Sequence, residues 1–185
     1  MTELASPGQL RAALLRWTLF LAPLLLLLGF LSGAVAGSTE FNPWFANLIK
    51  PALYPPAATF GIVWSVLYLL MGLALALVVT ARGAALRGIA IAVFAAQFVL
   101  NLLWSPLFFA LHRIAGALVL LGVLDLAVIA CIAVFHRVRP VAALLLLPYL
   151  GWCLFATVLN WQFLDANPGA DGVAASRAVA SVRFG

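Results

Sequence analysis

Polar and aromatic side chains recur at helical spacing inside long apolar stretches of this sequence. One stretch carries four of them at positions i, i+4, i+7 and i+8, on one helix face: Gln97, Asn101, Trp104 and Ser105. Such a polar stripe either bonds to a neighbouring helix or lines a cavity. The residues alone favour the helix–helix bond and leave the cavity open.

A later stretch carries Tyr149, Trp152, Ala156 and Asn160 on one helix face, and an earlier one places Trp64 and Tyr68 four residues apart. Amphipathic aromatics with a few amides make a flat apolar wall with directional polar groups, the composition expected of a pocket for a large planar ligand. The alternative is a stripe of core residues.

Acid–base and metal chemistry is poorly represented. Asp125 lies near the middle of an apolar stretch, where it is either a proton or ligand partner or a neutral acid bonded to a neighbouring helix. His112 and His136 lie at the ends of apolar stretches. The sequence has no GxSxG, P-loop or HExxH motif. We therefore assign no catalytic residue and no metal site.

The composition excludes a water-soluble protein. About 66% of the 185 residues are apolar and 8% are charged, whereas about a quarter of a soluble domain is charged. Each bilayer span needs about 20 apolar residues. The sequence predicts an all-α integral membrane protein with a five-transmembrane-helix bundle, whose spans are 10–36, 57–81, 86–110, 114–135 and 140–163.

The predicted domain plan is a tail over 1–9, the five-helix domain over 10–163, and a disordered tail over 164–185. Within the domain, the connection 37–56 is long enough to fold by itself. It combines four prolines with unusual apolar area, which favours a lid over the bundle. An aromatic belt at the membrane interface remains the alternative.

Charge predicts the orientation. Six arginines, at 11, 16, 82, 87, 137 and 139, fall on one side of the predicted spans, and only Lys50 and Arg113 flank the other side. Positive charge concentrates on the cytoplasmic side, so we expect a cytoplasmic N-terminus and an outer first loop. The net charge of +5 is thus a topology signal and does not indicate nucleic-acid binding.

Gly29, Gly33 and Gly37 recur every four residues in the first span. Such a ridge of small residues lets another helix approach closely. The partner helix could belong to a dimer or to the same bundle.

Four ordered segments carry a family resemblance: WFANLIKPALYPP, FGIVWSVLYLLMG, QFVLNLLWSPLFF and PYLGWCLFATVLNW. Together, over about 44–161, they resemble the TspO/MBR family of tryptophan-rich sensory and translocator proteins. The resemblance implies a five-helix bundle in the membrane, often a homodimer, with a lid over a pocket. For this chain we expect the membrane to be a bacterial cell membrane. It also implies tetrapyrrole ligands, protoporphyrin IX and haem, with no obligatory cofactor.

The resemblance also assigns residues. The lid is formed by Trp44, Lys50, Pro51, Pro55 and Pro56, and Trp44 also contributes to ligand binding. The pocket wall is formed by Trp64, Tyr68, Asn101, Trp104, Trp152 and Ala156.

Two departures matter. Leu53 and Ala58 stand where many family members have tryptophan, and the sterol motif of animal members is replaced around Trp161 and Asp165. The second departure argues against high-affinity sterol binding. The residues favour a ligand-binding membrane sensor or carrier that tunes porphyrin metabolism and stress responses. The alternative is an enzyme for light- and oxygen-dependent porphyrin degradation.

Overall fold

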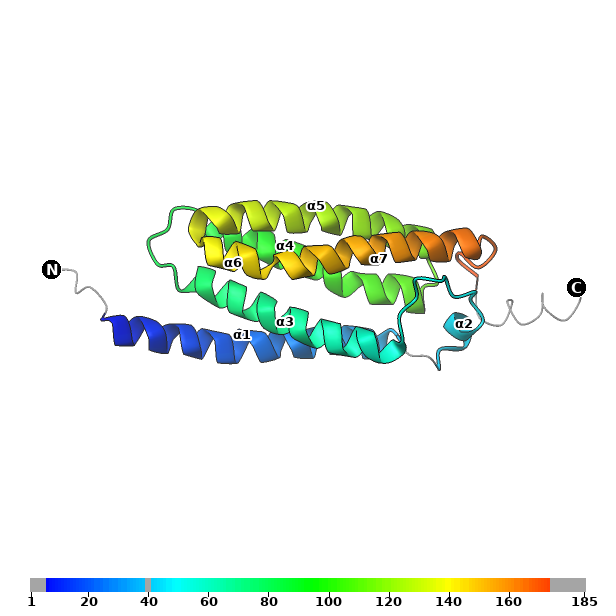
Figure 1. The fold of residues 1–185 in the computed structure, drawn as a ribbon, viewed down its shortest axis with the longest axis horizontal. Helices are drawn as coiled ribbons and strands as arrows, with labels where there is room; N and C mark the ends of the chain where they lie inside the picture. The colour runs from blue at the N-terminus through cyan, green and yellow to red at the C-terminus, as the bar shows by residue number, and fades with distance from the viewer. Residues whose placement is uncertain (1–5, 39–40, 174–185) are drawn as a thin grey trace, which may run out of the picture.

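A computed structural model describes residues 6–38 and 41–173 of the chain (Figure 1). Its long helices run roughly parallel to one another in an elongated bundle, and a short helix lies at one end. The elements are α1 (Pro7–Val35), α2 (Pro43–Ala46), α3 (Ala57–Val79), α4 (Arg87–Ser105), the π-helix η1 (Pro106–Ala110), α5 (Ile114–Val138), α6 (Pro140–Leu145) and α7 (Leu147–Ala166).

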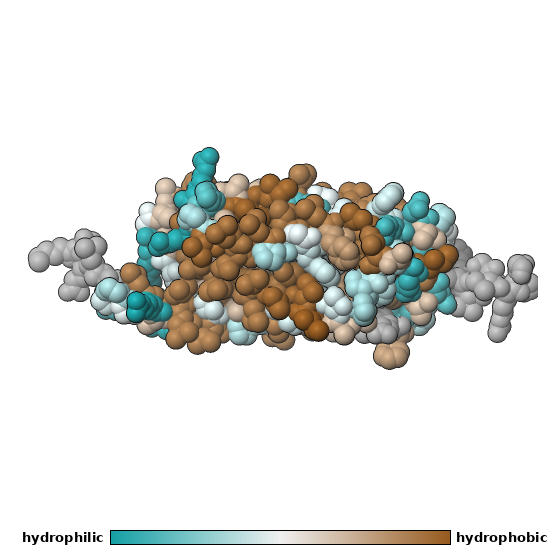
Figure 2. All heavy atoms as spheres, in the orientation of Figure 1, coloured by the Kyte–Doolittle hydropathy of each residue, from teal (hydrophilic) through white to brown (hydrophobic). Residues whose placement is uncertain are grey.

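Within the described residues, five helical segments are long and apolar enough to cross a membrane: α1, α3, α4 with η1, α5, and α6 with α7. Hydrophobic side chains gather over the middle of the surface in Figure 2, and hydrophilic ones lie mainly toward the two ends. Helices satisfy their own backbone groups, which a bilayer span requires. The predicted fold class, an all-α bundle of five spans, is confirmed.

The glycine ridge of the first span is used inside the bundle. A Cβ on Gly29 would collide with the ring of Tyr68 in α3, and one on Gly72 of α3 would collide with Ala22 of α1. The two helices lie side by side in Figure 1. Of the two partners left open by the sequence, α3 of the same chain occupies Gly29.

Two predicted spans are less regular than expected. The last α4 turn passes into the π-helix η1, closed by a bond of 2.9 Å from the Leu111 N–H to the Pro106 carbonyl. The fifth span breaks at Leu146, between α6 and α7, close to Pro148. Proline has no N–H to donate to the residue four positions earlier, so the helix cannot continue regularly there.

Two helices extend into the residues that the sequence assigns to the tails. Helix α1 begins at Pro7 because Ser6 and Gln9 form a capping box, with side-chain bonds of 3.3 and 2.9 Å to each other's backbone N–H. Helix α7 continues to Ala166, and residues 167–173 pack against the rest of the protein. The remainder of each expected tail, 1–5 and 174–185, lies outside the described residues.

Candidate functional site

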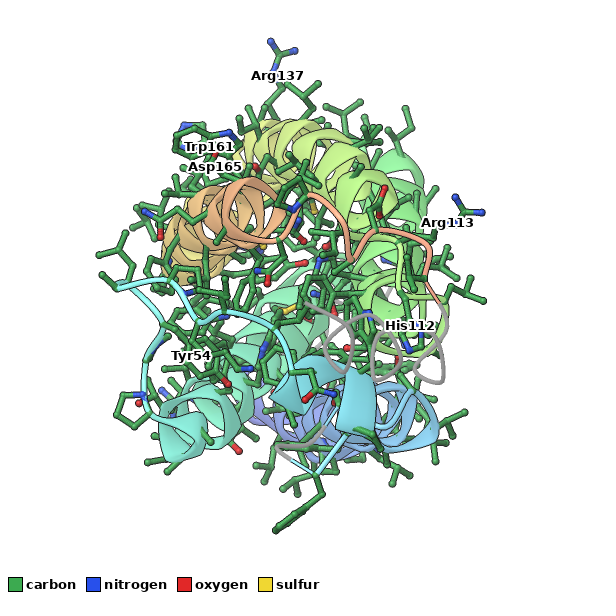
Figure 3. The ribbon with its side chains drawn as sticks, turned by 90° about the vertical axis from the view of Figure 1, so that its right-hand side faces the viewer. Tyr54, His112, Arg113, Arg137, Trp161 and Asp165 are labelled. Carbon is green, nitrogen blue, oxygen red and sulfur yellow. The ribbon has the colours of Figure 1, made fainter. Side chains whose placement is uncertain are left out.

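The larger cavity lies beneath the lid and has a volume of about 560 Å³. Its wall is mostly aromatic. The lid contributes Phe41, Phe45 and Tyr54, and the helices contribute Phe60, Trp64, Trp104, Phe108, Phe109, Trp152, Phe155 and Phe163. Figure 3 looks onto this end of the bundle, with Tyr54 on the lid side. The volume of this cavity falls within the range of about 300–1,000 Å³ usual for small-molecule sites.

A smaller cavity of about 370 Å³ adjoins the first one. It reaches to Gly29 and Phe30 of α1 and to Leu121 and Leu124 of α5. The two cavities share eight lining residues: Ser38, Ala57, Phe60, Trp64, Trp104, Ser105, Trp152 and Ala156. They therefore form one continuous region of aromatic wall.

The structure brings together the six residues predicted to form the pocket wall. Trp64, Trp104, Trp152 and Ala156 line both cavities, while Tyr68 and Asn101 line the smaller one. The rings of Trp64 and Tyr68 are stacked, with centroids 5.1 Å apart. Helical spacing placed these residues on common helix faces, and the family resemblance assigned them to the pocket wall.

Hydrogen bonds fix the polar groups of this wall. The Tyr68 hydroxyl donates to the Asn101 side-chain oxygen at 3.1 Å. The Trp104 indole donates to the Asn160 side-chain oxygen at 3.2 Å, and the Asn160 amide donates to the Ile114 carbonyl at 2.9 Å. Each bond joins two different helices, so the wall is held in one arrangement before any ligand arrives.

The polar stripe of α4 serves both of its possible roles. Gln97 lies behind the cavities, where its side-chain oxygen accepts a bond of 2.9 Å from the Tyr149 hydroxyl of α7. Asn101, Trp104 and Ser105 line cavities. The stripe thus holds helices together at one end and forms the pocket wall at the other.

Asp125 is bonded to a neighbouring helix. Its Oδ2 accepts from the Thr157 hydroxyl of α7 at 2.8 Å, and its Oδ1 has no hydrogen-bond partner among the described residues. It does not line either cavity. The contact agrees with the helix-bonding interpretation of this residue.

The Lys50 side chain binds other residues of the lid. Its ammonium donates to the carbonyls of Phe45 and Leu48 and lies 4.2 Å from the centroid of the Phe45 ring. Burial lowers the Lys50 pKa below its ordinary value. The lid residues assigned by resemblance, Lys50, Pro51, Pro55 and Pro56, are not part of either cavity wall.

Trp44, which the resemblance assigns to the lid and to ligand binding, does not line either cavity. It is 1% exposed and packs behind the cavity wall, edge-on to Phe108 at 5.5 Å. The Trp44 indole N–H donates to the Ala170 carbonyl at 3.4 Å. Its place is the contact between the lid and the bundle, because α2 turns this side chain away from the pocket.

The segment 167–173 clasps the lid. The Asn167 side chain accepts from the Ile49 N–H at 2.8 Å and donates to the Ile49 carbonyl at 3.0 Å. Gly172 donates to the His112 carbonyl at 2.7 Å, and the Asp171 side chain accepts from Ala115 at 3.2 Å, at the start of α5. The small and polar residues of this segment gave no sign of its contact with the lid, and bonds between residues distant in sequence leave no local pattern.

Sequence reasoning also missed the phenylalanine part of the wall: Phe60, Phe108, Phe109, Phe155 and Phe163. In a membrane helix a phenylalanine faces lipid as readily as it faces a cavity, so the residue type alone does not identify a cavity wall. Ala58 lines the larger cavity at one of the positions where the resemblance implies tryptophan, and its small side chain leaves space there.

The cavity walls are mainly apolar and aromatic. The two described cavity walls contain no Asp, Glu, His, Lys or Arg. Over residues 6–38 and 41–173, no cluster of three His, Cys, Asp or Glu side chains could hold a metal ion. What the walls offer is aromatic surface with amide, hydroxyl and indole groups.

Comparison with known proteins gives the family. The TspO/MBR family matches residues 20–165. Protein CrtK of Rhodobacter capsulatus is 37% identical over 148 residues, 76% of this chain and 91% of that protein. The tryptophan-rich sensory protein of Cereibacter sphaeroides is 36% identical over 156 residues, 82% and 92% of the two chains.

The likeness extends to animals. The translocator protein of Homo sapiens is 36% identical over 131 residues, 70% of this chain and 78% of that one. Together with the five apolar helices, these matches make the chain a multi-pass membrane protein. It belongs to the TspO/MBR family.

Proposed function

We propose that the chain binds tetrapyrroles, protoporphyrin IX or haem, in its two adjoining cavities and acts as a membrane sensor or carrier that tunes porphyrin metabolism and stress responses. Family membership supports a membrane sensor or transporter role in general terms. The observation that carries the tetrapyrrole proposal is the sharing of three tryptophans, Trp64, Trp104 and Trp152, by both cavity walls.

The wall suits a flat ligand for a physical reason. Aromatic rings gain about 0.5–1.5 kcal/mol per pair beyond buried area when they stack or meet edge to face. A macrocycle that spans the shared wall would meet several rings at once. Hydrogen-bonded amides at Asn101 and Asn160 supply fixed polar groups that orient it.

Tryptophan fluorescence tests this proposal. Protoporphyrin IX titrated into the purified protein in the dark should quench the emission with saturation. Replacing Trp64, Trp104 and Trp152 together by Phe should remove most of the saturable quenching. Three tryptophans remain: Trp17 and Trp161 are exposed, and Trp44 lies behind the cavity wall. Linear quenching in the native protein would contradict the proposal. A new pigment product formed only in light would instead favour porphyrin degradation.

We propose further that the lid end faces outward across a bacterial cell membrane. Arg11 and Arg16 lie in the N-terminal part of α1. The arginines at 82, 87, 137 and 139 lie in or beside the connections between α3 and α4 and between α5 and α6, at the opposite end of the bundle from the lid (Figure 1). A cysteine at exposed Asn47 should react with an impermeant thiol reagent on intact cells. Labelling only after lysis would reverse the orientation.

We also propose that the chain pairs as a homodimer. The apolar outer surface of the helices (Figure 2) leaves room for a partner, and α3 already occupies Gly29. Cross-linking in liposomes at low protein-to-lipid ratio would show a dimer band, and only monomer would contradict the pairing.

A further inference from the structure

A groove of about 360 Å³ opens between α5 and the α6–α7 break, at the end of the bundle opposite the lid. From α5 come Ile132, Ala133, His136 and Arg137, and from the other side come Ala143, Leu144 and Leu147. The α5 residues follow i, i+1, i+4 and i+5 spacing, so they form one helix face. The helix break at Leu146 separates the opposite wall into two parts.

The groove is apolar along its length and basic at one edge. Ile132 and Ala133 lie one turn deeper in the membrane span than His136 and Arg137, which belong to the last turn of α5. Both basic side chains are exposed, and Arg137 projects outward from the bundle (Figure 3). A guanidinium offers five N–H donors suited to phosphate oxygens.

No described acid neutralises this edge. The three acidic residues that the structure describes lie elsewhere: Asp125 is mid-span, bonded to Thr157, and Asp165 and Asp171 lie at the lid end. Arg87, at the same end as the groove, donates to the Val79 carbonyl. The charge of the groove edge is therefore available to an external anion.

We propose that this groove binds one anionic diacyl phospholipid from the adjoining leaflet. Its phosphate would meet Arg137 and His136, and one acyl chain would lie against Ile132, Ala133, Leu144 and Leu147. Charge complementarity selects the headgroup, because basic pockets between membrane helices recruit anionic lipids. The apolar part of the groove favours a lipid with acyl chains over a free anion.

Native mass spectrometry of the detergent-purified full chain would test the site, with titration of phosphatidylglycerol and of phosphatidylcholine carrying the same chains. Phosphatidylglycerol should bind first and with higher affinity. One basic side chain near an anionic surface contributes about 1 kcal/mol, so Arg137→Gln should weaken phosphatidylglycerol about fivefold. It should weaken phosphatidylcholine less, because the choline cation offsets the charge of the phosphate.

Two variants separate the groove from general surface charge. Arg82→Gln removes a charge at the same end but outside the groove, and it should change phosphatidylglycerol binding less than twofold. Ala133→Trp should fill the groove and weaken both lipids. Circular dichroism of each variant checks that the helices are intact.

Three results would overturn the proposal. One is equal binding of the two lipids by the native protein, and another is equal loss in Arg137→Gln and Arg82→Gln. The third is displacement of the lipid by millimolar inorganic phosphate, which would make the groove a site for free anions.

Discussion

The indole of Trp44 lies flat against the imidazole of His112, with ring centroids 4.4 Å apart and planes 18° apart. One ring comes from the lid and the other from the turn between η1 and α5. His112 takes a left-handed backbone conformation, with φ of 56°, and its Nδ1 lies 3.0 Å from the Val173 carbonyl. The lid, the turn and the C-terminal segment thus meet at one stacked pair, beyond the cavity.

Replacing Trp44 by Leu should loosen the lid. The change removes the stack on His112 and the bond to Ala170. An aromatic pair contributes about 0.5–1.5 kcal/mol, so hydrogen exchange at the Ile49 amide should accelerate about two- to twelvefold. The matched change Trp17→Leu, at an exposed site on α1, should leave that exchange rate unchanged. Equal acceleration in both variants would contradict the role of the pair.

Asn167→Leu tests the clasp. It leaves the Ile49 N–H and carbonyl without their side-chain partner, and a typical hydrogen bond contributes about 0.5–1.5 kcal/mol to stability. Exchange at Ile49 should accelerate at least about twofold. Gln162→Leu in α7, the helix that Asn167 follows, is the control, because the Gln162 side-chain oxygen is buried without a partner among the described residues. Unchanged exchange in Asn167→Leu would show that the clasp contributes nothing.

Ala156→Phe should reduce binding of protoporphyrin IX. Ala156 lines both cavities, and overpacking costs about 1–3 kcal/mol. If the cost falls on the complex, affinity decreases roughly fivefold to a hundredfold. Val158 also lies in α7 but is 45% exposed, so the Val158→Phe variant should bind as the native chain does. Fluorescence titration measures both, and the same affinity in the two variants would remove Ala156 from the site.

The pH dependence of Lys50 acylation reports on the lid. Burial lowers the Lys50 pKa below 10.5, so the closed lid binds fewer protons than the open lid between the lowered pKa and 10.5. Closure should strengthen as pH rises through that window. Lys50 is the only lysine of the chain, so peptide mapping isolates its reaction. The acylation midpoint should lie below that of the denatured protein, and equal midpoints would contradict the burial.

Much of the fold and of the pocket wall could be predicted from the sequence. Apolar runs of bilayer length have few alternatives to helices, so the five spans emerged with small errors at their ends. Trp64, Tyr68, Asn101 and Trp152 stood out because amphipathic groups are costly in lipid and turn inward, and the family resemblance then assigned them to the pocket wall.

Other parts could not be predicted. The direction of Trp44 depends on how α2 seats on Phe108 and His112, which no periodicity in a four-residue helix can encode. The clasp of Asn167 on Ile49 joins positions 118 residues apart. Phe108 and Phe109 line the cavity, but phenylalanine is equally stable against lipid, so the residue type does not predict this position.

The π-helix η1 amounts to one residue inserted into an α-helix, as its bond from Leu111 to Pro106 indicates. Each α-helical residue turns the chain by about 100°, so one added position changes the direction in which everything after it points. Deletion of one residue from 106–110 would restore the regular ladder and rotate His112 away from Trp44 by about that angle. The register of this single turn therefore determines whether Trp44 of the lid meets the His112 ring.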